Sequence, residues 1–305
     1  MTDGGLLVIG DVVTDVVARH GTALVHGTDT PARIRTLPGG AGANVACWAA
    51  RSGCADVRLL ARVGADSADW HQDALRRAGV RCLLAVDDDV PTATVVALVD
   101  STAERTFLTD SGAVLRLSPD DWSPSMLDGV THLHLSGYLL FAATSRATAL
   151  LALREARQRG IPVSVDPASA GFLAELGVDR FLAAAEGIDL LLPNADEARL
   201  LTGLPEPADA AAKLSLQAGR VVVTLGEGGA LLAVAGAVTR RVPAVHTRGA
   251  VDSTGAGDAF TGGFLAAYLA GAGDASAMAA GCRAGAEAVT TVGGRPDPQD
   301  RTPAP

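Results

Sequence analysis

The sequence predicts an α/β protein whose central sheet is mostly parallel and covered by helices on both faces. From residue 130 onward, helical segments follow four short apolar runs: THLHLSG, PVSVDP, IDLLLPN and RVVVTLG. Strands separated by helices in this way are typical of parallel sheets. Aromatic residues make up only 4% of the chain, so the core is built mainly from Ala, Val, Leu and Gly, which suits close packing of helices on a sheet.

The first third of the chain predicts the start of this sheet and a separate group of strands. The apolar run 6–9 ends at Gly10-Asp11, as expected for a buried parallel strand with a polar group at its carboxyl end. Residues 12–37 and 92–109 alternate only weakly and contain turn residues, so we expect short antiparallel strands outside the main sheet. Helices are expected over 43–52, 67–78, 145–159, 178–186, 195–202, 256–270 and 274–291. Residues 1–305 are expected to form one domain, with a flexible Pro-rich tail at 294–305.

Composition and charge argue against several classes of function. The 305 residues carry a formal net charge of −9, which disfavours DNA or RNA as a partner. The chain start lacks the basic region of a signal peptide, and no apolar run reaches membrane-spanning length. The four cysteines form no CxxC pair, which favours reduced thiols in the cytoplasm over disulfides or zinc. Lys213 is the only lysine and no GxxxxGK occurs, so a Walker-type P-loop is excluded.

The segment 252–264, DSTGAGDAFTGGF, carries the strongest signal for chemistry. Gly255, Ala256 and Gly257 are small, so the backbone can turn tightly and aim several N–H groups at one point. The apolar helix that follows adds the positive partial charge of its N-terminus, which favours a bound anion. Asp258 lies beside this turn, where its carboxylate could accept a proton from an attacking hydroxyl. An isolated segment of this kind is more often only a helix with a Gly-rich entry.

A second Gly-rich segment, PGGAGANVA, precedes the first predicted long helix. Gly39 and Gly40 permit close approach of the backbone to a ligand, and Asn44 offers a donor and an acceptor to sugar hydroxyls. A dinucleotide-binding fingerprint is an alternative, but no strong strand precedes the segment and no GxGxxG is complete. Three shorter patterns complete the set: GDVVTD at 10–15, NADE at 194–197 and TLGEGG at 224–229.

Taken in this order, the motifs resemble those of the ribokinase-like (PfkB-type) carbohydrate kinases over nearly the whole chain. The resemblance implies a three-layer α/β/α ribokinase-like fold with a mostly parallel central sheet and a small β-sheet lid, formed by 12–37 and 92–109. It implies an ATP-dependent phosphotransferase that moves the γ-phosphate to a hydroxyl of a sugar or sugar-like molecule. The lid would exclude water from the reaction. Lids of this type often pair across a homodimer and cover their own edges.

The resemblance also assigns roles to individual residues. The base would be Asp258, and the anion hole would be the backbone of Gly255, Ala256 and Gly257. The substrate would be bound by Asp15, Gly39, Gly40 and Asn44. ATP would be bound by Asn194, Thr224, Gly226 and Gly229. Mg²⁺ would be held through water by Glu197, and a monovalent cation such as K⁺ by Asp252 with carbonyls between 288 and 293. For Asp11 a loop-capping role and a ligand-binding role remain equally open.

The substrate is the part that the sequence specifies least. Ribokinases usually carry Lys where this chain has Ala41, and a substrate-binding Glu where it has Ser136-Gly137, so both departures argue against ribose. A phosphorylated acceptor would need cationic groups, for which Arg35, Arg105 and Arg116 are the candidates. A hexose, a keto-deoxy sugar acid and a nucleoside stay open. Small, uncharged Ala41 and Gly42 favour a neutral acceptor.

Two other classes of function were weighed against a kinase. The first is a catalytically silent sugar or nucleotide sensor on the same fold, which retention of Asp258 and the Gly-Ala-Gly turn disfavours. The second is a Rossmann-type oxidoreductase, which the incomplete fingerprint disfavours. His132 and His134 alternate on one strand without a neighbouring carboxylate, and we interpret them as structural rather than metal-binding. The triplet Asp87-Asp88-Asp89 is interpreted as a solvated turn before Pro91.

Overall fold

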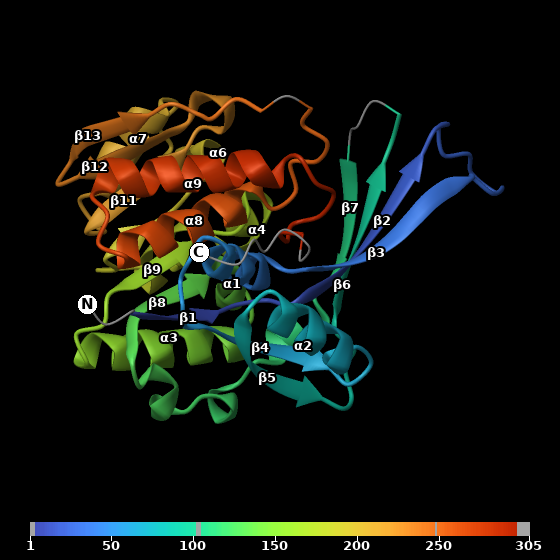
Figure 1. Cartoon of the computed structure of the whole chain (residues 1–305), viewed down its shortest axis with the longest axis horizontal. Coiled ribbons are helices and arrows are strands. Elements are labelled where there is room, and N and C mark those ends of the chain that lie inside the picture. The colour runs from blue at the N-terminus through green and yellow to red at the C-terminus, as the bar shows by residue number, and fades with distance from the viewer. Residues whose placement is uncertain (1–3, 102–104, 248, 298–305) are drawn as a thin grey trace, which may run out of the picture.

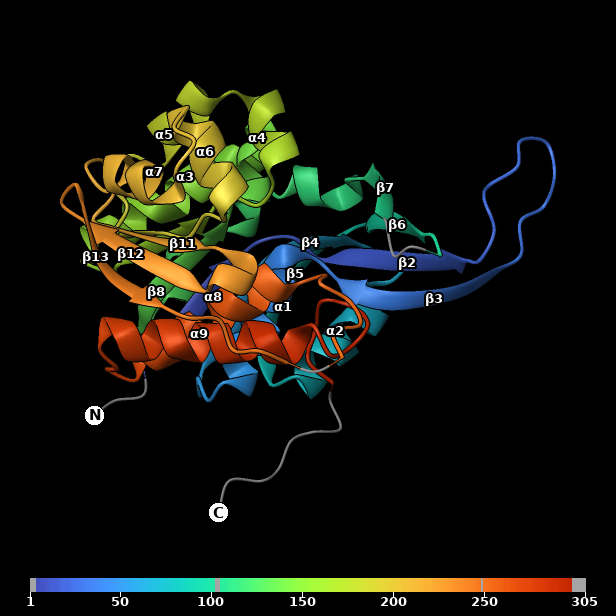
Figure 2. The ribbon, with the colours of Figure 1, turned by 90° about the horizontal axis from the view of Figure 1, so that it is seen from above.

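A nine-stranded sheet lies between two layers of helices, and a four-stranded sheet projects from one edge (Figures 1 and 2). The computed structural model describes residues 4–101, 105–247 and 249–297. The larger sheet has the strand order β13-β12-β11-β10-β9-β8-β1-β4-β5, and all its pairs from β11 to β5 are parallel. This confirms the predicted three-layer α/β/α fold with a mostly parallel sheet.

The strands of the central sheet follow the apolar runs of the sequence. They are β1 (Gly5–Ile9), β4 (Val57–Gly64), β5 (Val80–Asp87), β8 (Val130–Ser136), β9 (Val163–Asp166), β10 (Leu190–Leu191), β11 (Arg220–Thr224), β12 (Ala230–Val234) and β13 (Ala237–Val242). Successive residues of β1 face opposite layers: Leu7 and Ile9 pack into one core, and Leu6 and Val8 into the other. This alternation explains why β1 is apolar at every position.

The helices divide between the two faces of the sheet, as Figure 2 shows. One face carries α1 (Ala41–Arg51), α2 (Ala68–Arg77), α8 (Ala256–Leu269) and α9 (Asp274–Ala288). The other face carries α3 (Ala143–Gln158), α4 (Ala170–Leu176), α5 (Val178–Ala184), α6 (Ala195–Thr202) and α7 (Pro207–Leu214). The sequence reading missed α4 and α7, because short helices beside Gly and Pro leave little periodicity to detect.

The smaller sheet, which we call the lid, consists of β3 (Ala32–Gly39), β2 (Val13–His20), β6 (Ala93–Val99) and β7 (Arg105–Asp110), in that order. Its outer pairs are antiparallel, as expected, but β2 and β6 at its centre are parallel. Since β2 starts at Val13, only four residues after β1 ends at Ile9, the lid stands at the carboxyl edge of the central strands.

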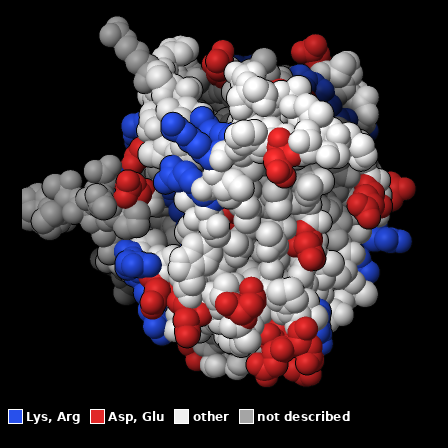
Figure 3. All heavy atoms as spheres, turned by 90° about the vertical axis from the view of Figure 1, so that its right-hand side faces the viewer, with Lys and Arg blue, Asp and Glu red and all other residues white. Residues whose placement is uncertain are grey.

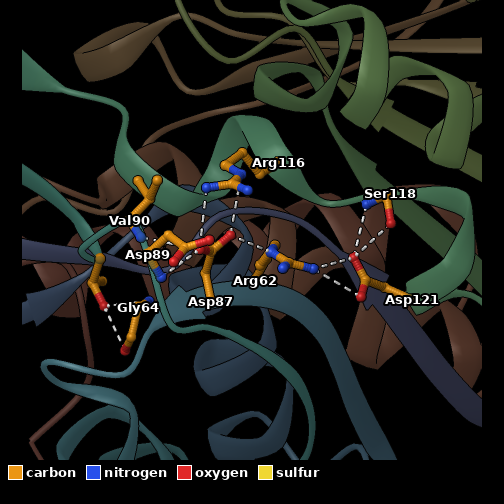
Figure 4. A network of polar contacts seen from close by, with 9 residues as sticks. Arg62, Gly64, Asp87, Asp89, Val90, Arg116, Ser118 and Asp121 are labelled. Atoms are coloured by element: carbon orange, nitrogen blue, oxygen red, sulfur yellow. Dashed lines mark hydrogen bonds and ion pairs between the residues drawn. The ribbon is translucent and has the colours of Figure 1, made fainter.

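A buried ion-pair network fixes the place where the lid returns to the central domain (Figure 4). Asp87, at the end of β5, is only 2% exposed and accepts from Arg62 Nε at 2.9 Å and from Arg116 Nη1 at 3.2 Å. Arg62 also pairs with Asp121 at 2.9 Å. Arg116 belongs to the 3₁₀ turn Gly112–Arg116 directly after β7. The prediction of a solvated turn is therefore wrong for Asp87, because arginines distant in sequence neutralise it.

The surface carries charges of both signs. Seen from the lid side, basic and acidic side chains both occur on a face that is largely uncharged (Figure 3). Within the described part of the chain, no helix is both long and apolar enough to cross a membrane. His132 and His134 are buried and share the hydroxyl of Ser164, at 2.8 and 2.9 Å, which agrees with a structural role.

Candidate active site

Polar side chains meet at the carboxyl edge of the parallel strands. Asp11 follows β1, Ser136 ends β8, Asp166 ends β9 and Asn194 follows β10. Asn194 also forms a parallel bridge with Thr224 at the end of β11. Because parallel strands present their carboxyl ends together, residues more than two hundred positions apart line one edge, where α/β sheets bind ligands.

Asp11 holds the Gly-rich segment that begins α1. Its carboxylate accepts from the backbone N–H of Ala41 at 2.7 Å and of Gly42 at 3.0 Å, and from the hydroxyl of Ser136 at 3.0 Å. Gly40 adopts φ 99°, and a Cβ there would meet the Asp11 carbonyl oxygen at 2.5 Å, so only glycine fits. Of the two roles left open for Asp11, the structure gives it the capping one.

The predicted anion cradle lies at the N-terminus of α8. Gly255 adopts φ 73°, and a Cβ on it would overlap the backbone of Gly294. The first turn of α8 contains Gly257 and Asp258. Their backbone N–H groups have no carbonyl acceptor within the helix and therefore remain available to a ligand. Gly255, Gly257 and Asp258 line one cavity, whereas Ala256 does not.

Asp258 faces Asn44 from the other Gly-rich segment. Asn44 Nδ2 donates to Asp258 Oδ2 at 2.8 Å. Burial raises the pKa of Asp258 to about 8, against the lowering effect of this hydrogen bond, and the nearby charges of Asp166, Asp11 and Asp15 raise it further. Among the residues that the structure describes, nothing donates to the buried Oδ1 of Asn44. Asn44 can therefore accept from a substrate hydroxyl while it orients Asp258.

Three further carboxyl groups at this edge have raised pKa values. Burial raises the pKa of Asp15 to about 6, although Arg295 opposes the shift. Burial likewise raises the pKa of Asp166 to about 6, against hydrogen bonds from the backbone of Ala168 and from Thr261. Burial and the charge of Asp166 raise the pKa of Glu197 to about 8. Such a crowd of partly or fully buried acids is typical of a functional site, since no compact core gains from it.

The NADE segment forms a capping box at the start of α6. Asn194 Oδ1 accepts from the backbone of Glu197 at 2.9 Å, and Glu197 Oε2 accepts from the backbone of Asn194 at 2.8 Å. Both side chains line the cavity. Of the other predicted ATP-binding residues, Thr224 adjoins Asn194, whereas Gly226 and Gly229 lie on the turn after β11; all three lie outside the cavity lining.

The loop after α9 connects several of these segments. Asp252 is buried and accepts from the backbone of Thr254 at 2.9 Å and of Gly293 at 3.1 Å. Trp48 Nε1 donates to the Gly294 carbonyl at 2.9 Å, and Arg295 Nη2 donates to the Gly39 carbonyl at 2.7 Å. The segment expected to be a flexible tail thus begins with two packed residues, and 298–305 lie outside the described part of the chain.

A cavity of about 1020 Å³ extends from the anion cradle to the underside of the lid. It brings together most of the predicted site residues: Asp15, Gly40, Asn44, Asn194, Glu197, Gly255, Gly257 and Asp258. Gly39 and Asp252 are not among the lining residues, although a Cβ on Gly39 would overlap the Asp15 carboxylate. Sequence reasoning missed Tyr138, Phe141 and Phe172, which also line it. Isolated aromatic residues after two different strands give no local pattern.

Of the arginines that could bind a second phosphate, Arg35 and Arg116 do not line this cavity. Arg116 is paired with Asp87, and Arg35 is exposed on β3. The side chain of Arg105 lies outside the described part of the structure. Among the described residues that line the cavity, Arg180 is the only Lys or Arg. This composition favours an uncharged acceptor.

Comparison with known proteins agrees with the geometry. The pfkB family carbohydrate kinase model matches residues 4–301. A fructokinase from Klebsiella pneumoniae is 34% identical over 281 residues, which cover 88% of this chain and 85% of that protein. A putative ribokinase II from E. coli, solved in complex with ATP and Mg²⁺, has a TM-score of 0.83 at 25% identity and covers 95% of this chain and 94% of that one.

An adenosine kinase from Sinorhizobium meliloti has the same fold, with a TM-score of 0.88 at 23% identity over 96% of each chain. The family model spans nearly the whole chain, and all but one of the motifs that it covers contribute residues to one cavity. The chain therefore belongs to the pfkB family of carbohydrate kinases.

Proposed function

We propose that this chain transfers the γ-phosphate of ATP to a hydroxyl of a sugar or sugar-like small molecule, with Asp258 as the base. The observation that carries the proposal is the position of Asp258. Its carboxyl group is buried beside the N-terminus of α8, accepts from Asn44 and faces the cavity. A hydroxyl that lies between Asp258 and the cradle could lose its proton to the carboxylate while it attacks the phosphorus.

The backbone of Gly255–Gly257 would receive the negative charge that develops on the transferred group. Preorganised N–H groups at a helix N-terminus are suited to this task, because they need not reorient during the reaction. Asp15, Gly40 and Asn44 would hold the acceptor hydroxyls at the other side of Asp258. Asn44 contacts both regions, so it would couple acceptor binding to the orientation of the base.

ATP and Mg²⁺ are the cofactors that the site supports. Mg²⁺, when bound, reduces the repulsion between phosphates. No group of three or more His, Cys, Asp or Glu side chains in the described structure could enclose a metal ion directly. The paired side chains of Asn194 and Glu197 are suited instead to a magnesium ion that keeps most of its water. Thr224, Gly226 and Gly229 would contact the rest of the nucleotide.

A monovalent cation would bind behind the anion hole. Asp252 lies there, buried, three residues before Gly255, and its carboxylate accepts from the backbone of Gly293. The cation would fix the geometry of the hole without touching the acceptor. Turnover should fall when K⁺ is replaced by tetramethylammonium at constant ionic strength. Equal turnover in both salts would rule out the proposed cation site.

The lid supports the further proposal that the chain acts as a homodimer in the cytoplasm. Ile34, Phe107 and Leu108 are more than half exposed on its strands. An exposed apolar sheet is a surface that proteins usually cover. Light scattering on the purified chain should give twice the monomer mass of 30.8 kDa.

The experiment that tests the kinase is a coupled ADP-release assay with MgATP and a panel of free sugars, sugar acids and nucleosides. We expect acceptor-dependent ADP release that is abolished in Asp258→Asn. If no acceptor on the panel stimulates ADP release although ligands bind, the result would refute the kinase and favour a sensor that only binds its ligand.

A further inference from the structure

The cavity is lined by two kinds of side chain. Asp15, Asn44 and Asp258 are polar and suit a polyol. Four others are aromatic: Phe107, Tyr138, Phe141 and Phe172. These are half of all the phenylalanine and tyrosine residues in the chain. In a protein so poor in aromatics, their concentration around one cavity requires an explanation.

Three of these rings form one contiguous cluster. Tyr138 and Phe172 meet edge to face with their centroids 5.1 Å apart, and Phe141 lies 5.0 Å from Phe172 and 6.1 Å from Tyr138. These separations are those of interacting aromatic pairs. All three side chains are only partly buried. The cluster thus keeps apolar surface open to the cavity, which is unfavourable unless a ligand covers it.

The rings are placed by the strands that also place the acids. Tyr138 lies in the 3₁₀ turn Gly137–Leu140 directly after β8, whose last residue, Ser136, donates to Asp11. Phe172 belongs to α4, which follows Asp166 at the end of β9. The aromatic cluster therefore lies beside the acids, because Ser136 at the end of β8 bonds to Asp11 and α4 follows Asp166.

Tyr138 lies close to side chains of both kinds. Its ring contacts Phe172, while burial and the charges of Asp11 and Asp258 raise the pKa of its phenol. A ligand beside Tyr138 would therefore be near hydrogen-bonding groups and a flat apolar surface at once.

The size and charge of the cavity complete the picture. Its volume of about 1020 Å³ lies at the upper end of the roughly 300–1000 Å³ that is common for ligand pockets. Even with the terminal phosphates of a nucleotide in place, this exceeds the need of a single monosaccharide. Arg180 is the only cation among the described lining residues, and the acidic Glu175 lines the same cavity. The aromatic cluster therefore suits an uncharged group.

We propose that the acceptor is a polyol joined to a flat unsaturated ring, as in a nucleoside, and that the ring packs on Phe141 and Phe172 while the hydroxyls face Asp15 and Asp258. This inference rests on the proposed kinase function and narrows its substrate class. Stacking on an aromatic surface tolerates different rings, because every flat ring presents a π face. Several nucleosides should therefore be accepted, and Phe172 should matter more than any single polar contact to the ring.

The test compares uridine and adenosine with free ribose and fructose as acceptors, in the full chain with saturating MgATP. We expect kcat/KM for at least one nucleoside to exceed that for either free sugar by about tenfold or more. In Phe172→Leu this ratio should fall about tenfold. Trp70→Leu, which removes a partly exposed aromatic on α2 outside the cavity, should keep the ratio of the native chain. A preference for free fructose or ribose overturns the proposal, as does a ratio that Phe172→Leu leaves unchanged.

A binding measurement separates this inference from the kinase itself. Calorimetric titration of the Asp258→Asn variant with uridine, adenosine and ribose should show tighter binding of a nucleoside than of ribose, and Phe172→Leu in the same background should weaken only that advantage. Nucleoside binding without turnover in the native chain would refute the kinase and keep the aromatic subsite. Turnover of free sugars without measurable nucleoside binding would keep the kinase and refute the subsite.

Discussion

Asn44 and Asp258 lie 214 positions apart in the chain and are joined by one hydrogen bond of 2.8 Å. Each stands beside a glycine-rich turn that begins a helix, α1 for Asn44 and α8 for Asp258. The bond therefore connects the part of the site proposed to hold the acceptor to the part proposed to hold the transferred phosphoryl group.

Replacing Asp258 by Asn should lower kcat by about 10²- to 10⁴-fold, the usual contribution of a general base. The amide is nearly isosteric and can still accept from Asn44, so the fold and ATP binding should survive. Turnover is measured by ADP release and ATP binding by calorimetry. Asp73→Asn, on the exposed surface of α2, is the matched control and should behave as the native chain. Near-normal turnover of Asp258→Asn would exclude the base role.

The pH dependence of turnover should follow the ionisation of Asp258. A base must be ionised to accept a proton, and burial raises the pKa of this carboxyl to about 8. We therefore expect kcat/KM for the acceptor to increase between pH 6 and pH 8 and to level off above. A profile that is flat across this range would contradict the assignment. The residual kcat/KM of Asp258→Asn should not increase with pH over this range.

The same pKa shift predicts that Asp258 destabilises the fold at alkaline pH. A carboxyl whose pKa is raised from 3.8 to about 8 on folding binds its proton more tightly in the folded state. Its ionisation therefore lowers the free energy of unfolding progressively as the pH rises from about 4 to about 8. Asp258→Asn should have a higher Tm than the native chain at pH 8.5, and the gap should narrow toward pH 5. A gap independent of pH would argue against the raised pKa.

Gly255→Ala should impair both the anion cradle and the loop behind it. The residue has φ 73°, and an added Cβ would overlap the backbone of Gly294, which cannot move aside without displacing Asn44. We expect a loss of at least tenfold in kcat and a lower Tm. Gly271→Ala provides the control, because Gly271 has φ 84° with open space around its Cβ position. If the two variants lose activity equally, the contact with Gly294 is not what matters.

Arg295→Gln should raise the KM for the acceptor more than it lowers kcat. The guanidinium holds the carbonyl of Gly39, and its charge opposes the raised pKa of Asp15. Without it, the Gly39–Gly40 segment loses a support and Asp15 should be protonated over a wider range of pH. Arg295→Lys, which keeps a donor and the charge, should recover part of the affinity. Arg283→Gln on the exposed side of α9 is the neutral comparison.

The sequence predicted the central sheet and the residues of the Gly-rich turns because those features are local. Apolar runs mark the strands, and segments such as DSTGAGDAFTGGF contain several site residues at once. The remaining contacts join distant positions. Nothing near Asp87 indicates Arg116, nothing near Gly39 indicates Arg295, and Phe172 gives no sign that Tyr138 lies beside it. Such pairs arise only when the strand order brings their elements together.

The loop that follows α9 has a practical consequence for anyone who handles this protein. It spans the distance from Asp252 to Trp48 and Gly39 with only a few residues, after the last helix is complete. A stop codon placed at Gly293 would spare every strand and helix that the structure describes, and the product should still be made in the cell. That product would nevertheless lack the contacts by which this loop connects the two glycine-rich turns. Shortening the gene from this end should therefore yield a folded protein without activity.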